Sequence, residues 1–274
     1  MILPALVVAA ILGLVEGITE FLPVSSTGHL IVAGSLLSFT GERAATFEIV
    51  IQVGAIFAVI WHYRALLGEL LMRWFQSPAE RRLGGSIVVA FLPAALVGLG
   101  MHRWIKLHLF TPVTVAGAFI VGGIVILILE WRRPAVSTDQ VHGISTKQAL
   151  GIGCAQVLAL FPGTSRSAAT ILGGYALGLS RAAATEFSFL LAIPTLIAAA
   201  GYDIFKSRHL FTAADIPMFA VGIGVSFVAA LFVIRGFLRY VQRHSFTVFA
   251  WYRIAFGVLI LGLAALHLLR MDAT

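Results

Sequence analysis

Six long apolar stretches dominate this chain, each close to the ~20 residues that an α-helix needs to cross a lipid bilayer. Because water is absent from the hydrocarbon core, the backbone of such a stretch must satisfy its own hydrogen bonds, as a helix does. Charged residues make up only 11% of the 274 residues, too few to cover a soluble domain. We therefore expect an all-α polytopic membrane protein with about six transmembrane helices. The stretches are 47–61, 86–101, 113–129, 187–202, 216–234 and 247–269.

The net charge of +7 comes from Lys and Arg residues that lie mostly between these stretches. With six spans, segments 62–85, 131–147 and 235–246 share one side of the membrane and carry ten of these residues. The other side carries six, among them Arg208 and Arg270. Cytoplasmic loops are usually the richer in Lys and Arg, so we expect the three segments to be cytoplasmic. This distribution explains the basic charge without a nucleic-acid partner.

Two further stretches are apolar but interrupted. Residues 11–30 read ILGLVEGITEFLPVSSTGHL and break at Pro23, whereas residues 151–170 read GIGCAQVLALFPGTSRSAAT and break at Pro162 and Gly163. Each continues into Ser, Thr and Gly after the break. Ionisable groups at membrane depth are costly and usually face protein or a watery cavity, so they often mark a functional site. We expect the function to reside in these two stretches.

The interrupted stretches lie at equivalent places in two similar halves of the chain. Glu16 aligns with Gln156, and RAATFE at 43–48 aligns with RAAATE at 181–186. The other aligned pairs are Gly13 with Gly153 and Phe21 with Phe161. These matches keep the same order and a similar separation, which indicates an internal repeat.

Each half is expected to form a broken helical hairpin followed by three spans. Three is an odd number, so the second half enters the membrane from the opposite side, as in inverted-topology repeats. Segments 11–40 and 149–180 contain no uninterrupted span, so we expect both to be re-entrant hairpins that meet near the midplane. The predicted architecture is a single membrane domain over residues 1–274, with halves 1–135 and 145–274.

The first hairpin carries two carboxylates. Glu16 and Glu20 are four residues apart, which places them on one helix face. Neighbouring carboxylates in a low dielectric repel each other, so they are expected to share a proton or to hold a divalent cation. The alternative is a structural carboxylate that is hydrogen-bonded to a neighbouring helix.

Hydroxyl residues follow the first break, where a second helix is expected to begin. Ser25, Ser26 and Thr27 can cap that helix, and the free N–H groups of a helix N-terminus bind anions. His29 lies three residues beyond Ser26, within reach on a helical turn to act as its base or acid. Capping explains at least one of the hydroxyls, but Ser26 near a histidine and two carboxylates predicts a nucleophile.

The second hairpin, with PGTSRSAAT at 162–170, predicts an anion cradle. Gly163 lets the backbone approach a ligand closely, and the planar fork of Arg166 suits phosphate oxygens. The alternative for Arg166 is an ion pair with Glu48 or Glu186. Further hydrogen-bond donors in this segment are Ser165, Ser167 and Thr170. Phosphoryl transfer depends on positioning and charge neutralisation, which the two hairpins together would supply.

Several other polar residues are expected to support the site without reacting. Glu48, Gln52 and Glu186 lie near the start of spans, and Gln156 lies in the second interrupted stretch. Arg253, near the start of the last span, is expected to extend to the membrane interface.

The chain resembles the undecaprenyl-diphosphate phosphatase family, the integral membrane type associated with bacitracin resistance. The resemblance runs essentially end to end and is strongest in EGITEFLPVSSTGH at 16–29 and in PGTSRSAAT at 162–170. These segments match the family's E-x-x-x-E, serine-rich and P-G-x-S-R-S-x-x-T motifs. The resemblance implies hydrolysis of undecaprenyl diphosphate to undecaprenyl phosphate and inorganic phosphate in the bacterial inner membrane. That reaction recycles the lipid carrier for peptidoglycan synthesis.

The same resemblance implies roles for individual residues. Glu16 and Glu20 are expected to bind a divalent metal, Mg²⁺ or Ca²⁺. Ser26 is expected to be the nucleophile with His29 as its acid–base partner, and Arg166 with its neighbouring hydroxyls to hold the diphosphate. The partners implied are undecaprenyl diphosphate and membrane lipid, with no nucleic acid, and a homodimer is left open.

The alternative class is a transporter or flippase for a lipid-linked phosphate, because inverted repeats and broken helices are common in transporters. An anion site built on Arg166 would serve either class. Transport needs neither a nucleophile nor an acid–base pair, so Ser26 and His29 favour the hydrolase. Direct attack by Ser26 on phosphorus and positioning of an attacking water are both left open.

Overall fold

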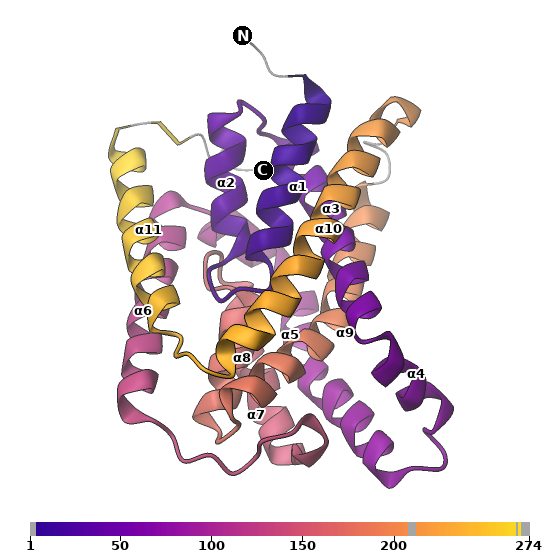
Figure 1. Cartoon of the computed structure of the whole chain (residues 1–274). Coiled ribbons are helices and arrows are strands. Elements are labelled where there is room, and N and C mark those ends of the chain that lie inside the picture. Colours follow the sequence, from indigo (N-terminus) through magenta and orange to yellow (C-terminus); the bar gives the residue numbers. More distant parts are fainter. Residues whose placement is uncertain (1–3, 208–211, 267, 270–274) are drawn as a thin grey trace.

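The computed structural model describes residues 4–207, 212–266 and 268–269, without the side chains of residues 102–103, 106–107 and 207. Within those residues the chain forms eleven α-helices and three short 3-10 turns (Figure 1). The helices are α1 (Ala5–Thr19), α2 (Ser26–Leu36), α3 (Glu42–His62), α4 (Arg64–Met72), α5 (Pro78–Leu109), α6 (Pro112–Arg132), α7 (Thr146–Val157), α8 (Arg166–Ala176), α9 (Arg181–Ser207), α10 (Ile216–Val241) and α11 (Thr247–Ala265).

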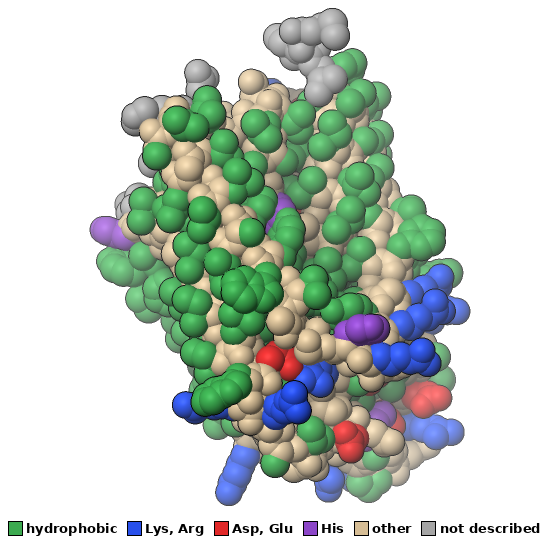
Figure 2. Space-filling view, turned by 60° about the vertical axis from the view of Figure 1, so that its left-hand side comes forward, with side chains coloured by type: hydrophobic (Ala, Val, Ile, Leu, Met, Phe, Trp, Pro, Cys, Tyr) green, Lys and Arg blue, Asp and Glu red, His purple; other side chains and the backbone are tan. Residues whose placement is uncertain are grey.

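Six helices are long and apolar enough to cross a bilayer, namely α3, α5, α6, α9, α10 and α11. They coincide with the six apolar stretches of the sequence, so the predicted all-α polytopic membrane fold is confirmed. Hydrophobic side chains cover most of the face seen in Figure 2, which suits contact with lipid rather than water. The chain is therefore a multi-pass membrane protein.

The two interrupted stretches form two pairs of short helices. The first pair, α1 and α2, lies at the end of the molecule where the chain begins, and the pair α7 and α8 lies toward the opposite end (Figure 1). The expected breaks are confirmed: α1 ends at Thr19 before α2 begins at Ser26, and α7 ends at Val157 before α8 begins at Arg166. The two breaks face each other inside the molecule.

Glycine makes close helix packing possible at matching places in the two pairs. A Cβ added at Gly13 would lie 2.5 Å from the carbonyl oxygen of Gly222, where α1 packs on α10. A Cβ added at Gly153 would lie 2.5 Å from the carbonyl oxygen of Ala90, where α7 packs on α5. Backbone-to-backbone approach of this kind is how small residues hold membrane helices together.

The connecting segments differ in one respect from expectation. Segment 62–85, predicted as a loop, contains α4 and the start of α5, where Ser77 accepts a hydrogen bond from the Glu80 N–H and Pro78 occupies the first turn. The sequence missed α4 because a nine-residue helix with two charges has no clear apolar period.

The three basic segments share one end of the molecule, the lower end in Figures 1 and 2, where Lys and Arg side chains gather. Their common side is thus confirmed, and their cytoplasmic orientation stays a prediction. Of the six basic residues expected on the other side, Arg208 and Arg270 lie outside the described residues.

Candidate active site

The two helix breaks are joined by a short chain of hydrogen bonds. Ser26 Oγ donates to Glu20 Oε2 at 2.6 Å, and Arg166 Nη2 donates to Glu20 Oε1 at 2.9 Å. Ser26 and Glu20 are buried and the Arg166 side chain is only 10% exposed, so the Glu20 carboxylate is held between a hydroxyl and a guanidinium in a low dielectric. Charge-assisted hydrogen bonds are strong in such surroundings. Groups 146 residues apart in sequence therefore form one unit.

Local backbone geometry sets the start of both second helices. Ser25 and Ser165 are the residues that precede α2 and α8, and both have positive φ, 69° and 74°. A residue other than glycine in this region costs about 1–2 kcal/mol, so the surrounding contacts must hold it there. The consequence is that Ser26 and Arg166 each begin a helix, turned toward the other hairpin.

Arg166 is positioned by contacts on several sides. Besides Glu20, its Nη1 donates to the carbonyl oxygen of Ser188 at 3.1 Å, and its guanidinium lies over the Phe21 ring at 5.8 Å. Its buried Nε has no hydrogen-bond partner among the described residues. One N–H of the fork thus stays available to an anion.

The hydroxyls around Arg166 mostly serve the protein itself. Ser167 Oγ donates to the carbonyl oxygen of Leu22 at 2.7 Å, which adds a second bond between the hairpins. Thr170 Oγ1 bonds to the Arg166 carbonyl and lies 2.6 Å from Ser188 Oγ. Ser165 Oγ accepts from the Ala168 N–H, and it alone of these three hydroxyl residues lines a cavity. Ser167 and Thr170 therefore hold Arg166 in place.

Gly163 has a backbone and packing role besides the expected close approach of a ligand, which stays a prediction. Its φ is +87°, and a Cβ there would lie 2.6 Å from the Val115 carbonyl oxygen in α6. The residue lines the smaller cavity, but backbone conformation and packing on α6 demand the glycine.

Two adjoining cavities open beside this cluster. The smaller, about 210 Å³, is lined by Glu20, Ser26 and Arg166 together with Ser25 and Ser165. The larger, about 460 Å³, combines polar and apolar walls. Both are lined by Ser26, Thr27, Gln52 and Phe110, among other residues. Apolar side chains of the larger cavity are Leu30, Ile31, Ile49, Ile105 and Phe110.

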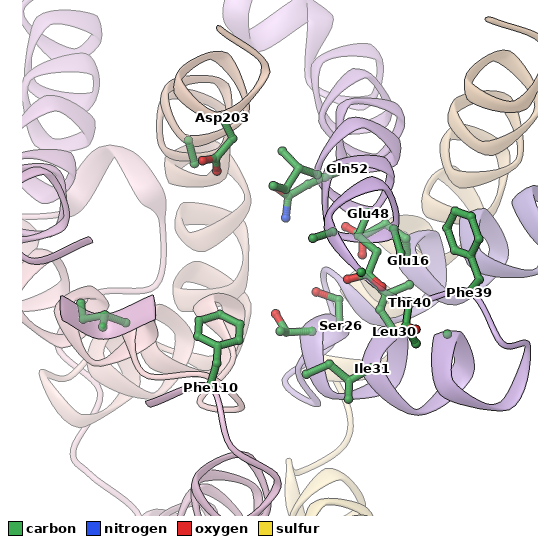
Figure 3. Close-up of a pocket in the computed structure, with 18 of the residues that line it drawn as sticks. Glu16, Ser26, Leu30, Ile31, Phe39, Thr40, Glu48, Gln52, Phe110 and Asp203 are labelled. Carbon is green, nitrogen blue, oxygen red and sulfur yellow. The ribbon is translucent and has the colours of Figure 1, made fainter. Parts of the chain in front are cut away.

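Glu16 and Glu48 lie next to each other on the wall of the larger cavity, on the same side as Ser26 (Figure 3). Glu16 is 1% exposed, and its Oε1 has no hydrogen-bond partner in the described part of the chain. Glu48 is partly buried, and two neighbouring carboxylates in such surroundings need a proton or a cation between them. Both oxygens of Glu20, by contrast, already have partners.

This donor set bears on the expected divalent metal. No cluster of three or more His, Cys, Asp or Glu side chains suited to a metal is present among the described residues. Mg²⁺ is commonly held by one or two carboxylates, water and substrate phosphates, which needs no such cluster. Glu16, with its unpaired oxygen, and Glu48 fit that requirement, whereas Glu20 is committed to Ser26 and Arg166.

The expected pairing of His29 with Ser26 is wrong. His29 Nδ1 lies 2.7 Å from the Ser25 carbonyl oxygen, and Nε2 lies 2.6 Å from the Tyr252 hydroxyl of α11. The ring stacks on Phe256 with centroids 4.2 Å apart. These contacts hold the His29 ring against α11, and the group bonded to Ser26 is Glu20 instead.

Of the four polar residues expected to support the site, two line a cavity and two do not. Glu48 and Gln52 line the larger cavity. Gln156 and Glu186 line neither cavity; Gln156 is 1% exposed and accepts from Thr195 Oγ1 at 3.3 Å. These last two residues therefore do not face the cavities beside Ser26.

Arg253 is the residue that sequence reasoning misjudged most. It was expected at the membrane interface, yet it is fully buried in α11 and donates four hydrogen bonds to backbone carbonyls. Arg253 lies in the second turn of an apolar helix, where the sequence alone cannot distinguish it from an arginine that extends to the interface. Only the packing of α11 against α6 and both helix breaks reveals its partners.

The apolar spans define an integral membrane protein. Its interior holds a hydroxyl, a carboxylate and a guanidinium beside a cavity, a combination suited to phosphate chemistry. The chain belongs to the bacitracin resistance protein BacA family, whose model matches residues 9–259.

Curated relatives match over almost their full length. One is undecaprenyl-diphosphatase 2 of Rhodospirillum rubrum, 56% identical over 94% of this chain and 95% of the relative. Another is the undecaprenyl-diphosphatase of Dechloromonas aromatica, 55% identical over 93% of each chain. That of Methylococcus capsulatus is 52% identical over 96% of this chain and 97% of its own.

Proposed function

We propose that this protein hydrolyses undecaprenyl diphosphate to undecaprenyl phosphate and inorganic phosphate in the bacterial inner membrane, which returns the lipid carrier to peptidoglycan synthesis. The observation that carries the proposal is the hydrogen-bonded chain Ser26–Glu20–Arg166 beside the cavities. This chain supports the roles proposed for its members, with Ser26 as nucleophile, Glu20 as base and Arg166 as the anion-binding fork. Membership of the BacA family and the names of the relatives support the substrate.

Ser26 and Glu20 supply the reacting groups. Glu20 accepts the Ser26 proton while Ser26 Oγ forms a bond to the terminal phosphorus and the bond from that phosphorus to the bridging oxygen breaks. The proton passes through Glu20 to the departing oxygen of undecaprenyl phosphate. Water then attacks the phosphoserine, and its proton passes through Glu20 back to Ser26 as inorganic phosphate leaves.

Arg166 stabilises the transferred phosphoryl group. In the structure its positive charge is balanced by Glu20, and its Nε points a spare donor into buried space. A diphosphate entering the smaller cavity would take up that donor and the N-terminus of α8. In the transition state, Arg166 then neutralises the negative charge that develops on the equatorial oxygens of the transferred phosphoryl group.

A divalent cation, Mg²⁺ or Ca²⁺, is proposed as cofactor. Glu16 and Glu48 would hold it together with substrate oxygens. Glu20 would attract the cation by its negative charge without being a direct ligand. When bound, such a cation supplies charge neutralisation of the diphosphate.

The proposed arrangement in the membrane follows from the helix pairs. We treat α1–α2 and α7–α8 as re-entrant hairpins of an inverted repeat with halves 1–135 and 145–274. Support comes from their opposite placement and from the matched geometry of Ser25 and Ser165. The apolar wall of the larger cavity suits the first isoprenoid units. A lipid tail would then leave sideways between helices.

The experiment is phosphate release from the purified full chain in detergent with undecaprenyl diphosphate, with and without a chelator. Ser26→Ala is the inactive reference. We expect release by the wild-type protein and none above background by the variant. Lipid crossing in liposomes without any phosphate release would support the transporter class and reject hydrolysis.

A further inference from the structure

Arg253 of α11 connects three separate parts of the molecule. Its Nη1 donates to the Pro23 carbonyl oxygen at 3.1 Å, and its Nη2 donates to the Gly163 carbonyl oxygen at 3.1 Å. The same guanidinium donates to the carbonyl oxygens of Phe119 and Ala118 in α6, at 3.3 and 2.9 Å. One side chain thus bonds to both helix breaks and to the helix that lies behind them.

The two anchored carbonyls occupy equivalent positions. Pro23 precedes Ser26 by three residues, and Gly163 precedes Arg166 by three residues. The intervening residues include Ser25 and Ser165, whose positive φ must be held by outside contacts. A shift of either carbonyl would therefore move the hydroxyl or the guanidinium at the head of the following helix.

The surroundings of Arg253 indicate a specific role for its shape. It is fully buried and has no carboxylate partner among the described ion pairs, so only carbonyl dipoles and the Phe119 ring at 5.1 Å compensate its charge. Burying a guanidinium this way is expensive unless each donor is used. Lysine could not replace it, since a single ammonium lacks the planar fork that spans two breaks.

We infer that Arg253 is a positioning residue that fixes the distance between Ser26 and Arg166 by holding the two helix breaks at once. The inference rests on the proposed function, because the distance matters only if both groups act on one diphosphate. Misplacing reacting groups by about 1 Å lowers turnover by about 100-fold in well-positioned enzymes. Removing the Arg253 fork should therefore lower kcat far more than it changes KM.

Gly122 of α6 offers a second, independent way to disturb the fork. A Cβ added at Gly122 would lie 2.3 Å from Arg253 Nη2 and 2.7 Å from its Cζ. Gly122→Ala thus displaces the guanidinium while its charge remains. Gly117→Ala is the matched control, because it adds the same methyl group to the same helix with nothing within 4 Å.

The test measures kcat and KM for phosphate release from undecaprenyl diphosphate by purified wild-type protein, Arg253→Lys, Gly122→Ala and Gly117→Ala, with thermal melting in detergent. We expect both Arg253→Lys and Gly122→Ala to lower kcat by about tenfold or more with KM within about threefold. Their melting temperatures should stay within about 4 °C of wild type, and Gly117→Ala should match wild type throughout.

A kcat equal to that of wild type in folded Arg253→Lys and Gly122→Ala would overturn this inference and leave the proposed function intact. Loss of folding in both variants would also overturn it, because Arg253 would then support the whole bundle rather than position two groups. No phosphate release by the wild-type protein would overturn the proposed function, and this inference with it.

Discussion

Ser26 Oγ lies 2.6 Å from Glu20 Oε2, and this pair lies where hydrogen bonds join the two helix breaks of the chain. The donor is the first residue of α2 and the acceptor follows the end of α1, so only five residues separate them in sequence. The other oxygen of Glu20 accepts from Arg166, which orients the carboxylate toward the serine. A hydroxyl bonded to an oriented carboxylate is prepared to give up its proton.

Ser26→Ala and Glu20→Gln should both abolish most phosphate release. The first removes the nucleophile and should lower kcat by on the order of 1,000-fold or more. The second keeps the size of the side chain but removes the base, which should cost about 100-fold or more. Ser245→Ala, in the α10–α11 connection and remote from both cavities, is the control. Equal kcat for Glu20→Gln and wild type would remove Glu20 from the mechanism.

Arg166→Lys should raise KM for undecaprenyl diphosphate by about tenfold or more, since one charge-assisted hydrogen bond is worth about 1.5–3 kcal/mol. The single nitrogen of a lysine ammonium lacks the separate, fixed nitrogens with which Arg166 bonds to the Ser188 carbonyl and to Glu20 and keeps a donor for a phosphate oxygen. Arg181→Lys is the matched control, because Arg181 pairs with Glu130 near the basic end of the molecule. That control should affect thermal stability and leave KM unchanged.

The spans and the two breaks could be predicted because each depends on local sequence. Apolar length gave the six membrane helices, and the prolines at 23 and 162 marked the interruptions. The order of the repeats also predicted that Ser26 and Arg166 would approach each other. What local sequence cannot give is the direction in which a side chain points once helices pack.

His29 and Arg253 illustrate that limit. Spacing placed His29 beside Ser26, but the rotation of α2 turns its ring toward Tyr252 of α11. Hydropathy placed Arg253 at the interface, but Gly122 leaves room for it on α6. Both errors involve α11, whose contacts with the first hairpin join residues more than 220 apart in sequence, so only long-range packing could reveal them.

His29→Ala should lower kcat through misplacement of the Ser25 backbone rather than through loss of a proton carrier. Its Nδ1 lies 2.7 Å from the Ser25 carbonyl oxygen, next to the nucleophile, so we expect about a tenfold or greater loss. The kcat–pH profile of the residual activity should keep its wild-type shape. Tyr252→Phe, which removes the partner of Nε2, should show a smaller loss with the same profile. Disappearance of one limb of the profile in His29→Ala alone would falsify this role.

Gly13→Ala and Gly153→Ala should each destabilise the fold by about 1–3 kcal/mol, because the new methyl group meets a backbone oxygen 2.5 Å away. The first clash lies between α1 and α10, and the second lies between α7 and α5. Gly100→Ala in α5 adds a methyl group with nothing within 4 Å and serves as the control. Thermal melting in detergent measures all three. Melting temperatures equal to that of wild type in both Gly13→Ala and Gly153→Ala would contradict the close packing of the two helix pairs.

The metal requirement should depend on Glu16 more than on Glu20. Glu16 has a buried oxygen without a partner beside Glu48, whereas both Glu20 oxygens are bonded. We expect a chelator to stop phosphate release and added Mg²⁺ or Ca²⁺ to restore it. Glu16→Gln should raise the cation concentration for half-maximal activity by about tenfold, since a carboxylate is a far better ligand than an amide. Glu48→Gln should act in the same direction.

Ser26→Thr is the control for that titration, because it alters the reacting hydroxyl without touching the carboxylates of the larger cavity. Its kcat should fall because the added methyl group crowds the bond to Glu20, while its half-maximal cation concentration should equal that of wild type. A change in cation requirement only in Glu20→Gln would assign the metal to Glu20 instead. Full activity of the wild-type protein in a chelator would show that Arg166 and the N-terminus of α8 neutralise the diphosphate without a cation.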